Sequence, residues 1–215
     1  RMMMTAFIGL GHISATYLDD ILIFATSLDK LLNNIDVILK RVRSVGLKLK
    51  ARKCEFAMQR VGYLGYHLDA SGVSPIPSKL EVIQKWPTPT TLKELRGFLG
   101  FVNRYFSFYP HLAIVSAALA RATGKRQFEW DAEMQQSFVN TKRALRDVNT
   151  LAIPAPKGKF VLETDASGVG IGAVLLQEQD GVERPIAFYS KALSDAETRY
   201  DTMKLELMAL VRSVQ

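Results

Sequence analysis

The sequence contains a single cysteine, Cys54, which excludes an intramolecular disulfide and any cysteine-rich zinc site. We expect Cys54 to pack as a small hydrophobic side chain in a reducing compartment. No stretch reaches the ~18 uninterrupted apolar residues of a membrane span, and residues 1–15 lack the organisation of a signal peptide. Internal repeats and low-complexity tracts are also missing. We therefore expect an intracellular protein with no membrane partner.

The composition is that of a globular protein with an excess of positive charge. Of the 215 residues, 48% are hydrophobic and 23% are charged, which is ordinary for a folded chain. There are 28 basic and 21 acidic residues, giving a formal net charge of +7. The excess is concentrated between Lys40 and Arg60, where Glu55 is the single acid. A basic run of this kind is either a solvated surface or a binding face for a polyanion such as nucleic acid.

Hydrophobic periodicity predicts a mixed α/β (α+β) chain. Residues 13–25 are predicted as two short strands with Asp19 and Asp20 in the tight turn between them. Residues 27–46 show the three-and-four apolar spacing of an amphipathic helix, with Ser27 as its N-cap and Gly46 as its terminator. Residues 47–56 and 61–73 are predicted as two further strands. The prolines between residues 75 and 89 mark a module boundary.

Beyond this boundary we expect helices first and strands later. The predicted helices cover residues 78–86, 90–106, 112–122 and 131–146, with a capping box at Thr91 and Glu94. Core candidates near the last of them are Phe138, Leu145 and Val148. Strands follow from residue 151, with a glycine-rich turn between residues 164 and 172 and a third strand at residues 184–193. The final helix has an apolar stripe formed by Met203, Leu207, Leu210 and Val214.

Two acidic positions stand out because acids interrupt apolar segments. Asp19 and Asp20 would repel each other at a turn, and a bound cation removes that repulsion. Hard Mg²⁺ takes oxygen ligands, and two-metal phosphoryl transfer uses such carboxylates. The alternative is that Asp-Asp is simply good turn chemistry. Asp165 lies between apolar strands, where an unpartnered carboxylate is costly to bury, and Glu206 in the last helix is either a ligand or a surface side chain.

Several stretches occur together in one order: "HISA", "YLDDILIF", "GLKL", "KCEF", "VGYLGYHLDASGV", "KLEVIQKWPTPTTLKELRGFLGFVNRYF", "FEW" and "TDASGVGIGAVLLQ". Together they resemble the reverse transcriptase and ribonuclease H region of a gypsy-like long-terminal-repeat retrotransposon polyprotein, and the resemblance covers essentially the whole chain. It implies the C-terminal part of a polymerase palm at residues 1–75 and a helical thumb at residues 76–127. Residues 128–215 would be a linking helix and the N-terminal half of a ribonuclease H-like domain.

The resemblance implies two sites for divalent metals. Asp19 and Asp20 match the metal-binding aspartates of the palm. Asp165 and Glu206 match an aspartate and a glutamate that share metals in ribonuclease H. The implied cofactor is Mg²⁺, with Mn²⁺ as a substitute, and the intact parent would hold two ions in each active site.

The resemblance also implies RNA, DNA and RNA/DNA hybrid as partners and deoxynucleoside triphosphates as substrates. Residues 63–68 would grip the primer strand, and residues 78–122 would hold the duplex through its backbone. The implied nucleic-acid contacts are Tyr17, Leu18, Tyr63, Leu64, Gly65, Lys93, Arg96, Asn103 and Arg104, with Lys79 and Lys85 as further candidates. For each thumb residue a solvated surface is the alternative. We expect five neighbouring residues to be core rather than to stack on bases: Trp86, Phe98, Leu99, Phe101 and Tyr105.

Both implied active sites need residues that the printed sequence does not contain. The family's palm has a third aspartate on an upstream strand, and its ribonuclease H has further acids after the first helix. We therefore expect little or no polymerisation by this chain alone. The alternative is a decayed or domesticated remnant that acts only as a non-specific nucleic-acid-binding module. The parent would work in a cytoplasmic virus-like particle, as a multifunctional enzyme with endonuclease activity that serves DNA integration.

Overall fold

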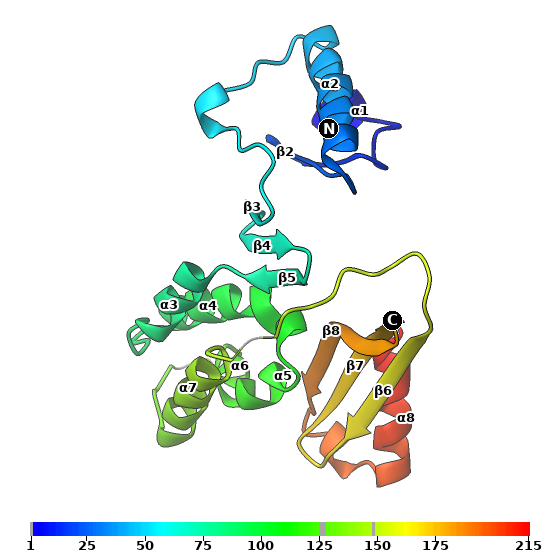
Figure 1. Ribbon diagram of the computed structural model, residues 1–215. Helices are drawn as coiled ribbons and strands as arrows, with labels where there is room; N and C mark the ends of the chain where they lie inside the picture. Colours follow the sequence, from blue (N-terminus) through cyan, green and yellow to red (C-terminus); the bar gives the residue numbers. More distant parts are fainter. Residues whose placement is uncertain (1, 125–127, 148) are drawn as a thin grey trace. The chain divides into compact units, whose positions relative to one another are not determined.

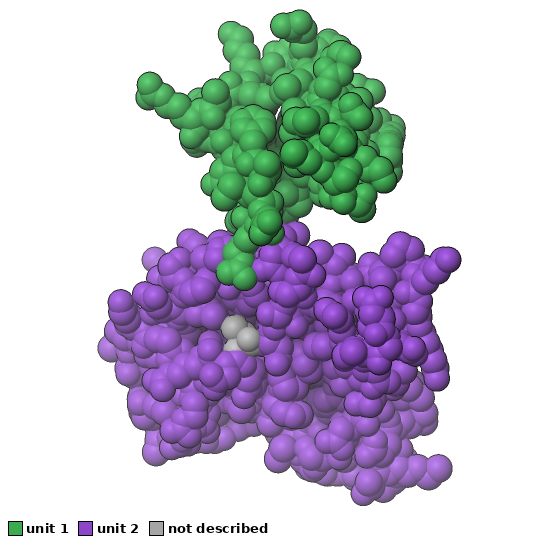
Figure 2. Space-filling model, viewed as in Figure 1, with its two compact units in different colours: residues 1–64 green, residues 65–215 purple. Residues whose placement is uncertain are grey.

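The computed structural model describes residues 2–124, 128–147 and 149–215, so the core candidate Val148 lies outside the described residues. The chain divides into two compact units, residues 1–64 and residues 65–215 (Figure 2). No helix in the described ranges is long and apolar enough to cross a membrane.

The first unit is built around an antiparallel hairpin and one long helix. Its elements are α1 (Met2–Ala6), β1 (Ser14–Tyr17), β2 (Asp20–Ile23), α2 (Leu28–Ser44), the 3₁₀ turn η1 (Ala51–Lys53) and β3 (Val61–Tyr63). The predicted long helix is confirmed, because the Ser27 side chain accepts a hydrogen bond from the Lys30 amide and Gly46 follows the helix end with φ +72°. A small core of Phe7, Leu10, Ile38 and Val42 joins the segment after α1 to α2, and Ile21 and Ile23 of the hairpin pack against it.

The strand predicted at residues 47–56 is wrong. This segment contains only η1, and Leu49 in its alternating part is 48% exposed. Alternation favours a strand only where a neighbouring backbone completes the hydrogen-bond ladder. Among the described residues no strand pairs with this segment. Residues 61–73 form parts of three short strands instead of one, with a turn at Leu64 and Gly65 and another at Ala70 and Ser71.

The first part of the second unit is a short hairpin followed by helices. The elements are β4 (Tyr66–Asp69), β5 (Gly72–Pro75), α3 (Pro77–Gln84), α4 (Leu92–Val102), the 3₁₀ helix η2 (Asn103–Phe108), α5 (Leu112–Val115), α6 (Ala117–Ala122) and α7 (Ala132–Ala144). The helix predicted over 112–122 is broken at Ser116, whose hydroxyl donates to the Leu112 carbonyl at 2.7 Å. The other predicted helices are confirmed, with shifted ends.

The helices bury an aromatic core. Phe98 is fully buried, with its ring centroid 4.8 Å from that of Phe138 and 5.8 Å from that of Trp86. Phe98, Leu99 and Tyr105 are core residues as expected, while Trp86 and Phe101 are partly buried against the same cluster. The predicted core residues Phe138 and Leu145 are buried too.

The predicted cap at the start of α4 is confirmed. The Thr91 hydroxyl accepts from the Glu94 amide at 3.2 Å. The Glu94 carboxylate returns to the Thr90 amide at 2.7 Å rather than to Thr91. The hydrogen bonds from the Thr90 amide and hydroxyl hold the pKa of Glu94 below its ordinary value.

The second part of this unit is an antiparallel sheet covered by one helix. Strands β6 (Phe160–Ala166), β7 (Gly170–Gln179) and β8 (Val182–Ala192) pair in the order β6-β7-β8, and the 3₁₀ turn η3 (Glu197–Arg199) precedes α8 (Thr202–Ser213). Figure 1 shows α8 lying along one face of this sheet. Ile171 on β7 packs there against Leu205 and Ala209. The predicted strands, the glycine-rich turn and the last helix are confirmed.

The apolar stripe identified on the last helix does not face the sheet. Met203, Leu207, Leu210 and Val214 are 83%, 60%, 47% and 69% exposed, whereas the sheet-facing side consists of Leu205, Met208 and Ala209. Both sides of α8 are apolar, so periodicity alone does not identify the buried one.

The other face of the sheet lies against α5. The Ala113 amide donates to the Ser190 hydroxyl at 3.0 Å. A Cβ atom added at Gly170 would lie 2.5 Å from Ile114 Cγ1, so this glycine permits the close approach of α5. A Cβ at Gly172 would meet the His111 ring at 3.5 Å. The helices and the sheet of the second unit are therefore packed together directly.

The hydrogen bonds of Glu197 predict that the second unit loses stability in acid. Its carboxylate accepts from the Lys191 ammonium at 2.5 Å and from the Ser194 amide and hydroxyl at 2.8 Å. These bonds, that of Lys191 foremost, lower the pKa of Glu197 from 4.5 to about 2. A depressed carboxylate pKa stabilises the fold above the unfolded value, and this contribution is lost as pH falls.

We expect the thermal midpoint to fall between pH 4.5 and about 2, and Glu197→Gln to flatten that fall. Unfolding followed by circular dichroism across this pH range measures the effect. The exposed Glu178→Gln is the matched control. An unchanged slope in Glu197→Gln would contradict this role.

Candidate active site and nucleic-acid interface

The acidic hairpin (residues 14–23) has a two-residue turn. Tyr17 pairs with Asp20, so Leu18 and Asp19 form the turn and Asp20 is the first residue of β2. The prediction that both acids occupy the turn is therefore wrong for Asp20. Leu18 adopts φ +49°, the left-handed region that a branched side chain rarely enters. The pairing register fixes this strained turn, which separates the two carboxylates onto turn and strand.

The hairpin is anchored at one end and open at the other. Ser14 is buried, and Ile21 and Ile23 pack against the core of the first unit. Asp19 and Asp20 are exposed at the turn end. The flanking strands are half-buried rather than fully buried, because a two-stranded hairpin packs on one face only. The apolar strand residues thus mount the carboxylates where solutes can reach them.

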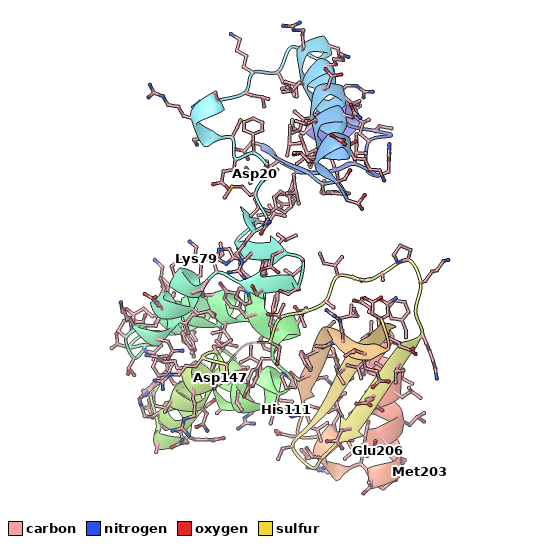
Figure 3. The ribbon with its side chains drawn as sticks, in the orientation of Figure 1. Asp20, Lys79, His111, Asp147, Met203 and Glu206 are labelled. Atoms are coloured by element: carbon pink, nitrogen blue, oxygen red, sulfur yellow. The ribbon has the colours of Figure 1, made fainter. Side chains whose placement is uncertain are left out.

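Three implied contact residues surround the acids. Tyr17 and Leu18 are 55% and 69% exposed beside them. The Tyr63 hydroxyl donates to the Ala15 carbonyl of β1 at 3.4 Å. Burial, and secondarily the nearby Asp20 carboxylate, raise the pKa of Tyr63 above its ordinary value. Tyr63 therefore lies against the hairpin, on the side of Asp20 (labelled in Figure 3).

The hairpin donors fit a hard divalent cation. Mg²⁺ in proteins commonly uses one or two carboxylates and completes its octahedron with water and substrate phosphates. Asp19 and Asp20 supply two exposed carboxylates on adjacent residues. Within the described ranges, no group of three or more His, Cys, Asp or Glu side chains could hold a metal ion. The hairpin thus offers a partial ligand set.

A second candidate site is a groove in the second unit, called here the glycine groove. It has a volume of about 360 Å³ and is lined by Gly65, Lys79, Gly97, Gly100, Phe101, Arg104 and Tyr105. A Cβ atom at Gly97 or at Gly100 would meet nothing within 4 Å, so α4 exposes bare backbone here. Lys79, labelled in Figure 3, belongs to the first turn of α3. Two cations therefore border an uncharged surface that is bare backbone at Gly97 and Gly100.

The hairpin β4–β5 is fixed to one side of this groove by Tyr66. The Tyr66 hydroxyl donates to the Arg104 carbonyl at 2.9 Å, and its ring stacks on Phe108 with centroids 5.3 Å apart. Burial raises the pKa of Tyr66, and the Arg104 cation opposes this rise. Gly65 has φ +89°, and a Cβ there would lie 3.2 Å from Arg104 Nη1. Glycine is thus required beside Arg104.

The other implied thumb contacts do not line the groove. Arg96 donates from Nη2 to the Thr123 carbonyl at 3.0 Å, so its guanidinium joins two helices. Lys93 and Asn103 are exposed outside the groove. Leu64, just before the groove residue Gly65, is 37% exposed with φ +52°. Of the implied nucleic-acid contacts, the structure brings Gly65, Arg104 and the further candidate Lys79 to the groove.

Sequence reasoning missed the groove floor. Residues 97, 100, 101 and 104 have the i, i+3, i+4, i+7 spacing of one helix face. Two glycines in a helix interior lower helix stability unless close approach by something else requires them. That pair of glycines was the available signal.

Asp165 and Glu206 lie on different sides of the sheet. Asp165 pairs with Gly172, whose face is turned toward α5, while its neighbour Ala166 packs toward α8. Glu206 is exposed on α8, near Met203 (Figure 3). Leu210 of the exposed stripe lies four residues after Glu206, so Glu206 is at the edge of that stripe and turned away from the sheet-facing Leu205. Both carboxylates reach solvent, and their joint metal site stays a prediction.

Sequence comparison identifies two family matches. Residues 1–68 match the family described as reverse transcriptase (RNA-dependent DNA polymerase). Residues 130–215 match the RNase H-like domain found in reverse transcriptase.

The similar curated proteins are transposon polyproteins. The chain is 36% identical to the retrovirus-related Pol polyprotein from transposon 297 of Drosophila melanogaster, over 91% of this chain and 18% of that protein. It is 34% identical to the corresponding polyprotein from transposon 412 of the same organism, over 98% of this chain and 17% of that protein. The transposon Tf2-3 polyprotein of Schizosaccharomyces pombe is 31% identical over 93% of this chain and 15% of that protein. The chain thus spans less than a fifth of these relatives.

Solved structures share the fold at low sequence identity. The foamy viral protease-reverse transcriptase dRH in complex with double-stranded DNA superposes with a TM-score of 0.90 and 19% identity, over 99% of this chain and 38% of that one. The foamy viral protease-reverse transcriptase in complex with RNA/DNA hybrid gives a TM-score of 0.86 and 19% identity, over 99% of this chain and 29% of that one. The predicted mixed α/β fold is confirmed, while the division into palm, thumb and ribonuclease H-like parts stays a prediction.

Proposed function

We infer that this chain is a reverse transcriptase segment of a retrotransposon Pol polyprotein, because residues 1–68 belong to the reverse transcriptase family and residues 130–215 to the RNase H-like domains of reverse transcriptase. We propose that it binds nucleic-acid duplexes for metal-dependent phosphoryl transfer. The observation that carries the proposal is the exposed pair Asp19 and Asp20 on an anchored hairpin. The gypsy-like assignment is consistent with these relatives.

In this proposal the acidic hairpin holds the catalytic metal ions. Asp19 and Asp20 supply oxygen ligands for Mg²⁺ or Mn²⁺. The bound ions would neutralise the charge that develops on the reacting phosphoryl group. Tyr63 packs against β1 and keeps the hairpin in position, through its bond to the Ala15 carbonyl. Tyr17 and Leu18 present exposed apolar surface to the end of a primer beside the carboxylates.

The glycine groove would hold the duplex through its backbone. Lys79 and Arg104 are cations on the groove rim, suited to phosphate oxygens. Gly97 and Gly100 leave room for a sugar-phosphate chain to approach α4. Contacts of this kind give affinity without sequence preference. Template choice would then depend on base pairing and not on this surface.

The RNase H-like half is proposed to contribute Asp165 and Glu206 to hybrid cleavage in the whole polyprotein. Deoxynucleoside triphosphate use, endonuclease action, service to DNA integration and a cytoplasmic virus-like particle belong to the same proposal for the parent. A second candidate is retention of duplex binding alone. For the isolated chain this candidate is supported by the hairpin's partial ligand set, because no third metal-ligating side chain joins Asp19 and Asp20 among the described residues.

Duplex binding through the groove predicts a defined salt dependence. Lys79→Ala with Arg104→Ala should weaken duplex affinity and lower the salt slope by about 1.8, since each phosphate contact contributes about 0.9. Fluorescence anisotropy with a labelled DNA duplex at several salt concentrations measures both quantities. The matched control is Lys157→Ala with Arg143→Ala, two exposed cations outside the groove.

Gly100→Leu tests whether the duplex occupies the groove, without changing the charge of the groove. Gly100→Leu fills the open floor and adds helix propensity of roughly 0.8 to 1 kcal/mol. We expect duplex binding to fall while thermal stability holds or rises. If Gly100→Leu binds the duplex as tightly as the unchanged chain, the duplex does not lie in the glycine groove.

A further inference from the structure

Residues 47–60, called here the basic arm, form an open segment between α2 and β3. Figure 1 shows it as the cyan loop that carries η1. Its internal order rests on a few local bonds, including those from the Lys53 amide to the Lys50 carbonyl at 2.8 Å and from the Cys54 amide to the Ala51 carbonyl at 3.0 Å. Leu47 and Cys54 are half-buried, and the other residues of the arm are exposed.

The arm combines cations with exposed apolar side chains. Lys48, Lys50, Arg52 and Lys53 are exposed, and Glu55 is the one acid in the arm. Leu49, Phe56 and Met58 are 48%, 60% and 59% exposed among them. Three large apolar side chains exposed within one short basic segment are more than the single exposed apolar residues common on protein surfaces. The combination is the one that single-stranded nucleic acid uses, with cations on the backbone and an aromatic ring under a base.

We propose that the basic arm is a binding site for single-stranded nucleic acid, distinct from the glycine groove. Phe56 stacks on a base, the exposed Leu49 and Met58 offer further apolar contacts, and Lys48 and Lys50 contact phosphates. The occupant is a single strand because the bases of a duplex are stacked on one another and their faces are closed to Phe56. This inference rests on the proposed function only in that the chain binds nucleic acid.

The backbone of the basic arm has an unusual conformation at one residue. Ala57, between Phe56 and Met58, has φ +53°, a conformation that an alanine rarely adopts. A left-handed residue breaks the strand alternation, so the two flanking side chains do not follow a regular strand pattern. The extended backbone is thus interrupted between Phe56 and Met58, whose side chains are both exposed.

The test compares two probes on the whole chain. The first is a fluorescein-labelled oligothymidine of about 12 nucleotides, within the range that single-strand sites cover. The second is an abasic phosphodiester oligomer of the same length, which offers charge without bases. Phe56→Ala should weaken oligothymidine binding about tenfold and leave abasic binding unchanged. Lys48→Ala with Lys50→Ala should weaken both probes and lower the salt slope by about 1.4, at about 0.7 per contact.

Matched controls come from residues 157–160, which repeat two lysines and a phenylalanine elsewhere. Phe160→Ala removes a ring that is 51% exposed on β6, and Lys157→Ala with Lys159→Ala removes two exposed cations. These variants should bind oligothymidine as the unchanged chain does. Circular dichroism melting should show every arm variant folded, because the replaced side chains are exposed.

Three results overturn the inference. Phe56→Ala binding oligothymidine unchanged removes the stacking role. An equal loss of affinity for both probes in Phe56→Ala shows that the arm binds by charge alone. Equally tight binding of polyglutamate or anionic vesicles to the arm shows a non-specific polyanion surface. Loss of all binding by the unchanged chain, duplex included, would instead refute the proposed function. Retained duplex binding with an inert arm refutes this inference alone.

Discussion

Asp20→Asn, made in a polyprotein that contains this segment, should lower primer extension by at least about 100-fold, because loss of a charged group at the reacting phosphate removes roughly 2.7 kcal/mol or more of transition-state stabilisation. The neutral amide keeps the shape of the side chain and removes the negative charge that holds a hard cation. Asp20 is exposed at the start of β2, so the replacement leaves the core untouched.

The measurement is primer extension with Mg²⁺ and then with Mn²⁺. The matched control is Asp36→Asn, an exposed acid of α2 that pairs with Lys40 at 2.6 Å. It should extend primers as the unchanged polyprotein does. The isolated 215-residue chain should give little or no extension in either metal. Full extension by Asp20→Asn would show that this carboxylate is turn chemistry and nothing more.

Phe98→Ala should cost about 3 to 5 kcal/mol of unfolding free energy in the second unit. The ring is fully buried between those of Trp86 and Phe138. Its removal leaves a cavity that three packed helices cannot close, since their crossing is also fixed by the surrounding apolar side chains.

Urea unfolding followed by tryptophan fluorescence measures this loss, because Trp86 and Trp130 both belong to the same cluster. Phe160→Ala is the control, and its exposed ring should change stability by about 0.5 kcal/mol or less. A loss below about 1 kcal/mol in Phe98→Ala would mean that the helices do not share one core.

Sequence patterns predicted the elements whose ends and faces have local causes. Ser27 and Thr91 cap their helices through side-chain bonds within three residues, so local chemistry suffices. The aromatic residues of α4 were predicted as core, and Phe98 is buried accordingly. The acidic hairpin was identified because two acids interrupt an apolar run, and its resemblance supplied the role.

Features that depend on distant partners were not predictable in this way. The turn register puts Asp20 on the strand, which depends on pairing with Tyr17 rather than on composition. Residues 47–56 alternate like a strand without a partner to pair with in the described chain. The sheet-facing side of α8 is set by Ile171 of β7, and no local signal separates Leu205 from Leu207.

The glycine groove shows the same limit from the functional side. Its members come from a turn and three helical segments, and only the fold brings Gly65, Lys79 and Arg104 together. Arg96 is a cation like Arg104 and lies next to Gly97 on α4, yet its guanidinium donates to the Thr123 carbonyl instead of lining the groove. Residue type alone therefore predicted a cationic surface and not the residues that line the groove.

Binding of a divalent cation by the acidic hairpin can be measured through paramagnetic broadening by Mn²⁺. In the isotope-labelled chain, we predict that trace Mn²⁺ broadens the amide signals of residues 18–21 before others in the first unit. Asp19→Asn with Asp20→Asn should abolish that broadening, and Asp36→Asn should preserve it. Broadening that persists in the double variant, or that never reaches residues 18–21, would contradict the claim.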